Sequence, residues 1–127
     1  MKKKNLFLIV ALGLLMITGS AMAYTYDFTF SPPYSGCMNS TGLNKLSGGT
    51  PYVYPKVSST PTSYYLASTP YSGLTEVTNY IVNISTPGKR YFTYNSGEGY
   101  GNKRYCLSGY PTNYNFSMYN VYGDWQP

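Results

Sequence analysis

Residues 24–30 alternate between aromatic and polar side chains, and this pattern constrains the fold more than any other feature of the chain. An aromatic ring occupies every second position, and Thr25, Asp27 and Thr29 fill the positions between them. A period of two places all the rings on one face of an extended strand. We therefore predict a half-buried β-strand that ends at Ser31-Pro32-Pro33.

Short segments of the same kind continue along the chain, separated by turn residues. The further predicted strands lie at 52–54, 64–67, 77–84, 91–94, 104–107 and 116–125. Short strands at turn-separated intervals are typical of two-layer antiparallel folds. The sequence thus predicts an all-β domain, a small antiparallel β-sandwich of about seven strands.

Several of these segments carry more specific expectations. Pro55 should break strand 52–54 and place it at a sheet edge. Strand 77–84 should be a core strand, with Tyr80, Val82 and Ile84 on its buried face. The glycine-rich residues 97–102 should form a hairpin loop between strands 91–94 and 104–107. Strand 116–125 should place Tyr119, Val121 and Trp125 on one face.

The first 23 residues have the three parts of a secretory signal peptide. Three lysines at positions 2–4 precede an almost unbroken apolar run at 6–17, and Ala21 and Ala23 then supply the small residues that signal peptidase requires. A membrane anchor is the alternative, but it needs about 20 apolar residues and this run has about a dozen. We expect cleavage before Tyr24, which leaves a secreted, extracellular domain of residues 24–127.

The charge of this domain argues against a nucleic-acid partner. The whole chain has a formal charge of +5, with nine basic and four acidic residues. Three basic residues leave with the signal peptide, so six remain against four acidic residues, a net charge of +2. Nucleic-acid binding proteins usually present a dense basic stripe. Two dibasic pairs, Lys89-Arg90 and Lys103-Arg104, do not form one.

The two cysteines, Cys37 and Cys106, both lie in the domain that we expect to be exported. In an oxidising compartment, one disulfide between them is the simplest expectation. The alternatives are a reactive thiol pair or a metal site, but the chain has no CxxC spacing and no histidine. We therefore predict a structural disulfide that joins the loop after the first strand to the penultimate strand, and no bound metal.

The catalytic inventory of the chain is small. Without histidine, acid–base catalysis would depend on four carboxylates, lysine or tyrosine. Glu76 and Glu98 could meet as a glycosidase pair, but one begins a strand and the other lies in a turn. We expect no enzymatic activity and no cofactor.

Tyrosine is the unusual component, with all seventeen tyrosines in the domain of residues 24–127. Most of them can serve as strand and core residues in place of leucine and valine. Tyr65, Tyr71, Tyr100 and Tyr110 lie in or near predicted turns, where exposed rings can stack on sugars or anchor a protein interface. These four are the candidate binding residues, and a cell-wall glycan or a surface protein is the expected partner.

The C-terminal third resembles a known group of proteins. Residues 91–97, residues 102–105 and the pattern Tyr119-x-Val121-x-Gly123-x-Trp125 are similar to the closing segment of an uncharacterised family of small secreted proteins from Gram-positive bacteria. The acidic tail of that family is replaced here by Gln126-Pro127. The resemblance implies a secreted β-domain. Genes of the family often lie beside bacteriocin-type exporters, so the alternative function is a bacteriocin-like antimicrobial or an exporter companion.

Overall fold

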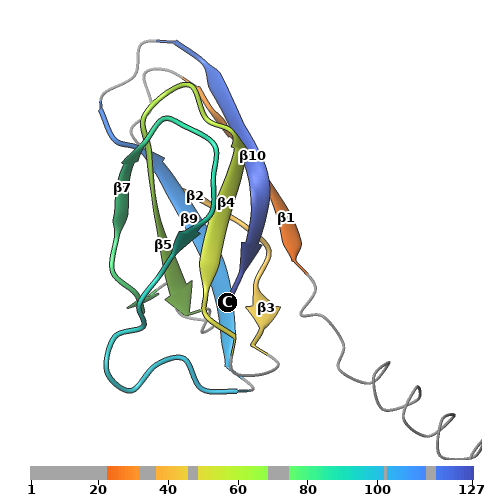
Figure 1. The fold of residues 1–127 in the computed structure, drawn as a ribbon, viewed down its shortest axis with the longest axis vertical. Helices are drawn as coiled ribbons and strands as arrows, with labels where there is room; N and C mark the ends of the chain where they lie inside the picture. Colours follow the sequence, from red (N-terminus) through yellow and green to blue (C-terminus); the bar gives the residue numbers. More distant parts are fainter. Residues whose placement is uncertain (1–22, 32–36, 46–48, 69–74, 102, 114–116) are drawn as a thin grey trace, which may run out of the picture.

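The computed structural model describes residues 23–31, 37–45, 49–68, 75–101, 103–113 and 117–127 (Figure 1). These residues form ten β-strands and no α-helix. The strands are β1 (Tyr24–Phe30), β2 (Met38–Asn39), β3 (Leu43–Asn44), β4 (Tyr52–Val57), β5 (Thr62–Ser68), β6 (Thr75–Glu76), β7 (Ile81–Ile84), β8 (Arg90–Tyr91), β9 (Arg104–Pro111) and β10 (Tyr119–Gln126). The all-β prediction is confirmed for this part of the chain. The described part has ten strands where about seven were expected, because several two-residue segments also join the ladders.

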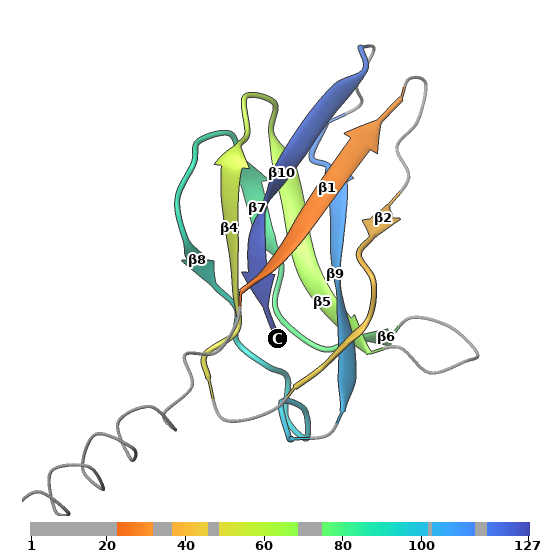
Figure 2. The same ribbon diagram turned by 90° about the vertical axis from the view of Figure 1, so that its right-hand side faces the viewer.

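The strands form two antiparallel sheets, which lie one behind the other in Figure 2. The four-stranded sheet has the order β1-β10-β4-β8. The six-stranded sheet has the order β2-β9-β5-β6, with β3 also pairing with β9 and β7 with β5. The first and last strands, β1 and β10, pair along seven residues. The two ends of the described chain therefore stabilise each other within one sheet.

Aromatic side chains fill the space between the sheets. The rings at every second position of β1 point into this core, and Trp125 on β10 is fully buried. Tyr26 on β1 meets Tyr64 on β5, with ring centroids 5.8 Å apart and hydroxyl oxygens 3.3 Å apart. Both tyrosines thus bury their rings and hydrogen-bond their polar ends to each other, as buried tyrosines usually do. The expected inward faces of 24–30 and of Tyr119, Val121 and Trp125 on β10 are confirmed.

The prediction that Pro55 breaks its strand is wrong. β4 continues through Pro55 to Val57 and lies between β10 and β8. The Pro55 carbonyl accepts a hydrogen bond from the Gly88 N–H, so it points away from β10. The N–H and C=O of one residue point to the same side of a strand, so an N–H at position 55 would also point away from β10. β8 pairs only with Tyr52 and Val53, so the N–H that proline lacks is not needed for either ladder.

The prediction of a continuous core strand at 77–84 is also wrong. The segment divides into a single bridge at Thr78 and the short strand β7, and Asn83 has a left-handed φ of +60°. Two of the three residues expected inside are outside: Tyr80 is 40% exposed and Val82 is 58% exposed. Ile84, the third, is half-buried and packs against the core. Val77 and Thr78 are the buried residues of this segment.

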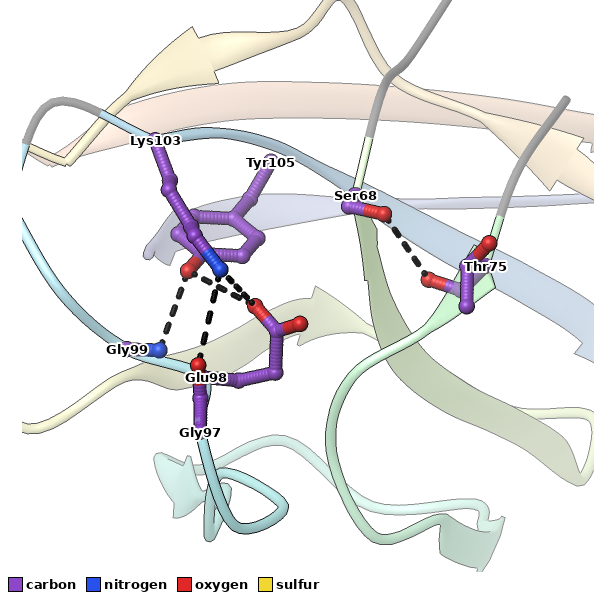
Figure 3. Close-up of polar contacts among 7 residues, drawn as sticks. All are labelled: Ser68, Thr75, Gly97, Glu98, Gly99, Lys103 and Tyr105. Carbon is purple, nitrogen blue, oxygen red and sulfur yellow. Dashed lines mark hydrogen bonds and ion pairs between the residues drawn. The ribbon is translucent and has the colours of Figure 1, made fainter. Parts of the chain in front are cut away.

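Residues 97–102 do not close a hairpin, because the strands on either side belong to different sheets. β8 pairs with β4 and β9 pairs with β5, so the loop crosses from one sheet to the other. Glu98 holds it in place: Tyr105 Oη and Lys103 Nζ lie 3.3 and 3.2 Å from its carboxylate (Figure 3). Gly97 and Gly99 both adopt positive φ, which glycine tolerates without strain.

The predicted disulfide is wrong, because Cys37 and Cys106 are free thiols in the structure. The segment after β1 does lie beside β9, as the predicted disulfide required, but it does so as strand β2, with Met38 opposite Gly109. Continuing this register places Cys37 level with Tyr110, four residues along β9 from Cys106, so their Cα atoms are offset by roughly 13 Å along the strand. Disulfide formation requires Cα atoms within about 7 Å. The register of β2 on β9 thus keeps the two cysteines apart.

Candidate binding surface

Three tyrosines gather on the outward face of the six-stranded sheet. Tyr65 lies on β5 and Tyr110 on the neighbouring β9, and their ring centroids are 6.3 Å apart. Tyr80, just before β7, packs against both rings at 5.0 and 6.3 Å. We call these three residues the tyrosine triad. Two of the four candidate residues, Tyr65 and Tyr110, thus pack together with Tyr80, which was predicted to face the core.

The strand period explains why Tyr65 and Tyr110 face outward. Tyr64, the neighbour of Tyr65, points inward and is fully buried. Tyr65 pairs with Ser108 and Tyr110 with Ser63, which makes the two tyrosines diagonal neighbours on one face of the ladder. The triad covers this part of the sheet, where the Ser63 and Ser108 side chains are fully buried.

Polar groups border the triad. A hydrogen bond from the Tyr80 hydroxyl to the Glu76 carboxylate raises the pKa of Tyr80 to about 12. On the other side, Cys37 Sγ lies 3.5 Å from the Tyr65 hydroxyl. Burial, followed by the contact with Cys37, raises the pKa of Tyr65. Tyr65 and Tyr80 therefore stay neutral at physiological pH, and an acidic residue, Glu76, lies at the margin of the triad.

The other two candidate residues do not join this surface. Tyr100 lies in the loop between the sheets, is 63% exposed, and has Lys103 Nζ 6.0 Å from its ring centroid. Tyr71 lies outside the described residues, as does Ala21 of the predicted cleavage site. Ala23 is exposed and directly precedes Tyr24, the first residue of β1.

The acidic residues that could have formed a catalytic pair have separate partners. Glu76 interacts with Tyr80, whereas Glu98 interacts with Lys103 and Tyr105. Within the described part of the chain, no three side chains of the metal-ligating types come together. No described segment forms a helix with the length and apolar character needed to cross a membrane.

Tyr80 was missed because a period of two was assigned to the whole of 77–84. Asn79 and Asn83 gave a contrary signal, since asparagine is depleted in strands and tolerates left-handed backbone. The Asn79 carboxamide accepts a hydrogen bond from the Thr93 backbone N–H, outside any regular ladder. If the two asparagines are taken as turn residues, the strand pattern is interrupted and Tyr80 is no longer predicted to face the core.

Comparison of the chain with protein-family models, with curated proteins and with solved structures finds no significant match.

Proposed function

We propose that this is a secreted, non-enzymatic binding protein that uses the tyrosine triad to bind a cell-wall glycan. The scaffold in this proposal is a small β-sandwich whose core leaves the outward face of the six-stranded sheet to the ligand. The observation that carries the proposal is the clustering of Tyr65, Tyr80 and Tyr110, contributed by three separate segments, on one outward face.

The chemistry of the triad suits a sugar ring. One face of a pyranose presents C–H groups, which pack on an aromatic ring, while its hydroxyls need hydrogen-bond partners. The triad supplies tilted tyrosine rings, and Glu76 and Asn39 lie nearby. Asn39 already accepts a hydrogen bond from Ser108 at 2.6 Å, which fixes its side chain. Aromatic contact and polar acceptors thus come from one surface.

Retention of the purified protein on cell walls tests this proposal. We expect Tyr80→Ala and Tyr110→Ala to reduce retention about tenfold, since each removes a large ring from the centre of the surface. Tyr100→Ala is the matched control, because it removes an equally large, exposed ring far from the triad in the fold. Retention that is equal in all variants, or equal to that of denatured protein, would contradict the proposal.

Treating the walls before the assay identifies the ligand class. Loss of retention after digestion of the glycan, but not after protease treatment, is expected. The reverse result would indicate a surface protein as the partner and would contradict a glycan ligand. The bacteriocin-like alternative stays a prediction, and growth inhibition of related strains by the purified protein is its test.

A further inference from the structure

The outward face of the four-stranded sheet carries a groove that the triad does not use. Its volume is about 440 Å³, within the range of about 300–1,000 Å³ typical of small-molecule sites. The groove crosses β1, β10 and β4, and its walls include Thr25, Asp27, Lys56, Tyr122 and Asp124. It therefore lies on the sheet opposite to the one that carries the triad.

A β-bulge forms one side of this groove. Tyr122 pairs with Val57 and Gly123 with Pro55, so Lys56 is an extra residue of β4. Bulges re-aim side chains and occur preferentially beside functional sites. Here the extra lysine extends to Asp124 on the neighbouring strand, with Nζ 3.0 Å from Oδ2. The ion pair fixes one acidic and one basic group at the groove.

A second carboxylate is held on the other side. The Asn120 carboxamide donates to Asp27 Oδ1 and also lies 3.2 Å from Thr29 Oγ1. Because a carboxylate can accept about four hydrogen bonds, Asp27 keeps capacity for a ligand hydroxyl or amide N–H. Tyr122, on β10 opposite Asp27, is 44% exposed and supplies a ring for stacking.

We propose that this groove binds a neutral oligosaccharide of N-acetylated amino sugars. Asp27 and Asp124 would accept hydrogen bonds from hydroxyl and acetamido groups, Lys56 would donate, and one sugar ring would stack on Tyr122. Two carboxylates against one ammonium make the groove unfavourable for an anionic glycan. The inference rests on the proposed function because both take a glycan as the ligand. The groove, however, is a different surface from the triad. If both surfaces bind, the protein can bridge two glycan strands.

Titration of the full domain with a chitin oligosaccharide, followed by calorimetry or NMR, tests the groove. Binding of this neutral probe and no binding of an oligogalacturonate are expected. Tyr122→Ala should weaken binding about tenfold, and Asp27→Asn should also weaken it. Tyr122→Phe keeps the ring and should bind like the parent protein. Circular dichroism of each variant checks the fold.

The controls separate this inference from the proposed function. Tyr80→Ala removes part of the triad without touching the groove, so it should reduce wall retention about tenfold and keep chitin-oligosaccharide binding. The proposal for the groove is overturned if the parent protein does not bind the oligosaccharide. It is also overturned if Tyr122→Ala and Asp27→Asn bind it as well as the parent protein does. Neither result would contradict the proposal for the triad. Loss of oligosaccharide binding in Tyr80→Ala alone would also overturn the proposal for the groove.

Discussion

Tyr26 and Tyr64 show how single side chains let a tyrosine-rich chain build a core. Each ring replaces an aliphatic residue between the sheets, and the two hydroxyls satisfy each other across the interface at 3.3 Å. Burying an unpaired hydroxyl would cost about 1–3 kcal/mol, so this contact matters more than its own modest strength suggests. The same residue type serves at the surface, where the triad leaves its rings partly exposed.

The buried pair predicts a loss of stability at alkaline pH. Burial raises the pKa of Tyr64 to about 12 and raises that of Tyr26 as well, whereas tyrosine in the unfolded chain titrates near 10. Between about pH 10 and 12 the unfolded state therefore holds fewer protons than the folded state, and the free energy of unfolding falls as pH rises. Below about pH 10 this stabilisation is complete.

Denaturant unfolding at a series of pH values measures this effect. Tyr26→Phe removes one titrating group and should make the alkaline fall shallower, after an initial cost of about 1 kcal/mol for the lost hydrogen bond. An unfolding free energy that stays constant up to pH 12 would contradict the buried environment of both hydroxyls.

The two cysteines should react differently with an alkylating reagent. Cys37 is exposed, whereas Cys106 is 1% exposed and burial raises the pKa of its thiol. The thiolate is the reactive form, so native protein should acquire one label at Cys37 and denatured protein two. Mass spectrometry without reductant gives the count. Denatured, unreduced protein that takes up no label would show that the cysteines are joined after all.

At the level of elements, the β10–β4 ladder illustrates how a local irregularity shapes a surface. The bulge keeps Gly123 against the β4 backbone: a Cβ added at Gly123 would overlap the Tyr54 carbonyl oxygen and lie 2.9 Å from Pro55 Cα. Glycine at this position is needed for the close approach of two strands. The groove beside the bulge depends on the same register shift.

Gly123→Ala should therefore destabilise the protein. The overlap is with backbone atoms, which cannot rotate away, so we expect a loss of about 1–3 kcal/mol or more in the free energy of unfolding. Gly101→Ala is the matched control, because no atom lies within 4 Å of its added Cβ. Equal melting temperatures for the two variants would argue against the observed register of β4 on β10.

At the scale of the molecule, the predicted cleavage site lies directly before the folded domain. Tyr24 is the first residue of β1, pairs with Trp125, and has its ring 6.4 Å from the Trp125 ring. Removal of residues 1–23 would thus leave the whole β1–β10 ladder intact.

The secreted protein should begin at Tyr24. Intact-mass measurement of the protein from the culture medium gives its N-terminus directly. Ala23→Asp removes a small residue that signal peptidase requires and should leave the precursor in the cell fraction. Recovery of uncleaved chain from the medium would contradict the predicted signal peptide.

Local pattern was sufficient for the all-β class, for β1 and for the inward face of β10. It placed Tyr65 and Tyr110 in or near turns, whereas both lie within strands, β5 and β9. A period of two is a property of consecutive residues, so it can be recognised without knowing any partner strand. It also indicates which rings of Tyr24–Phe30 face the core.

The remaining features depend on contacts between residues far apart in the chain. Strand register separates Cys37 from Cys106, because Met38 pairs with Gly109. The assignment of β8 and β9 to different sheets turns an expected hairpin loop into a crossing between layers. Tyr80 joins the triad only because β5 and β9 place two rings beside it. Pairing and packing across such distances are set by the sum of many weak contacts, which short segments of sequence do not encode separately.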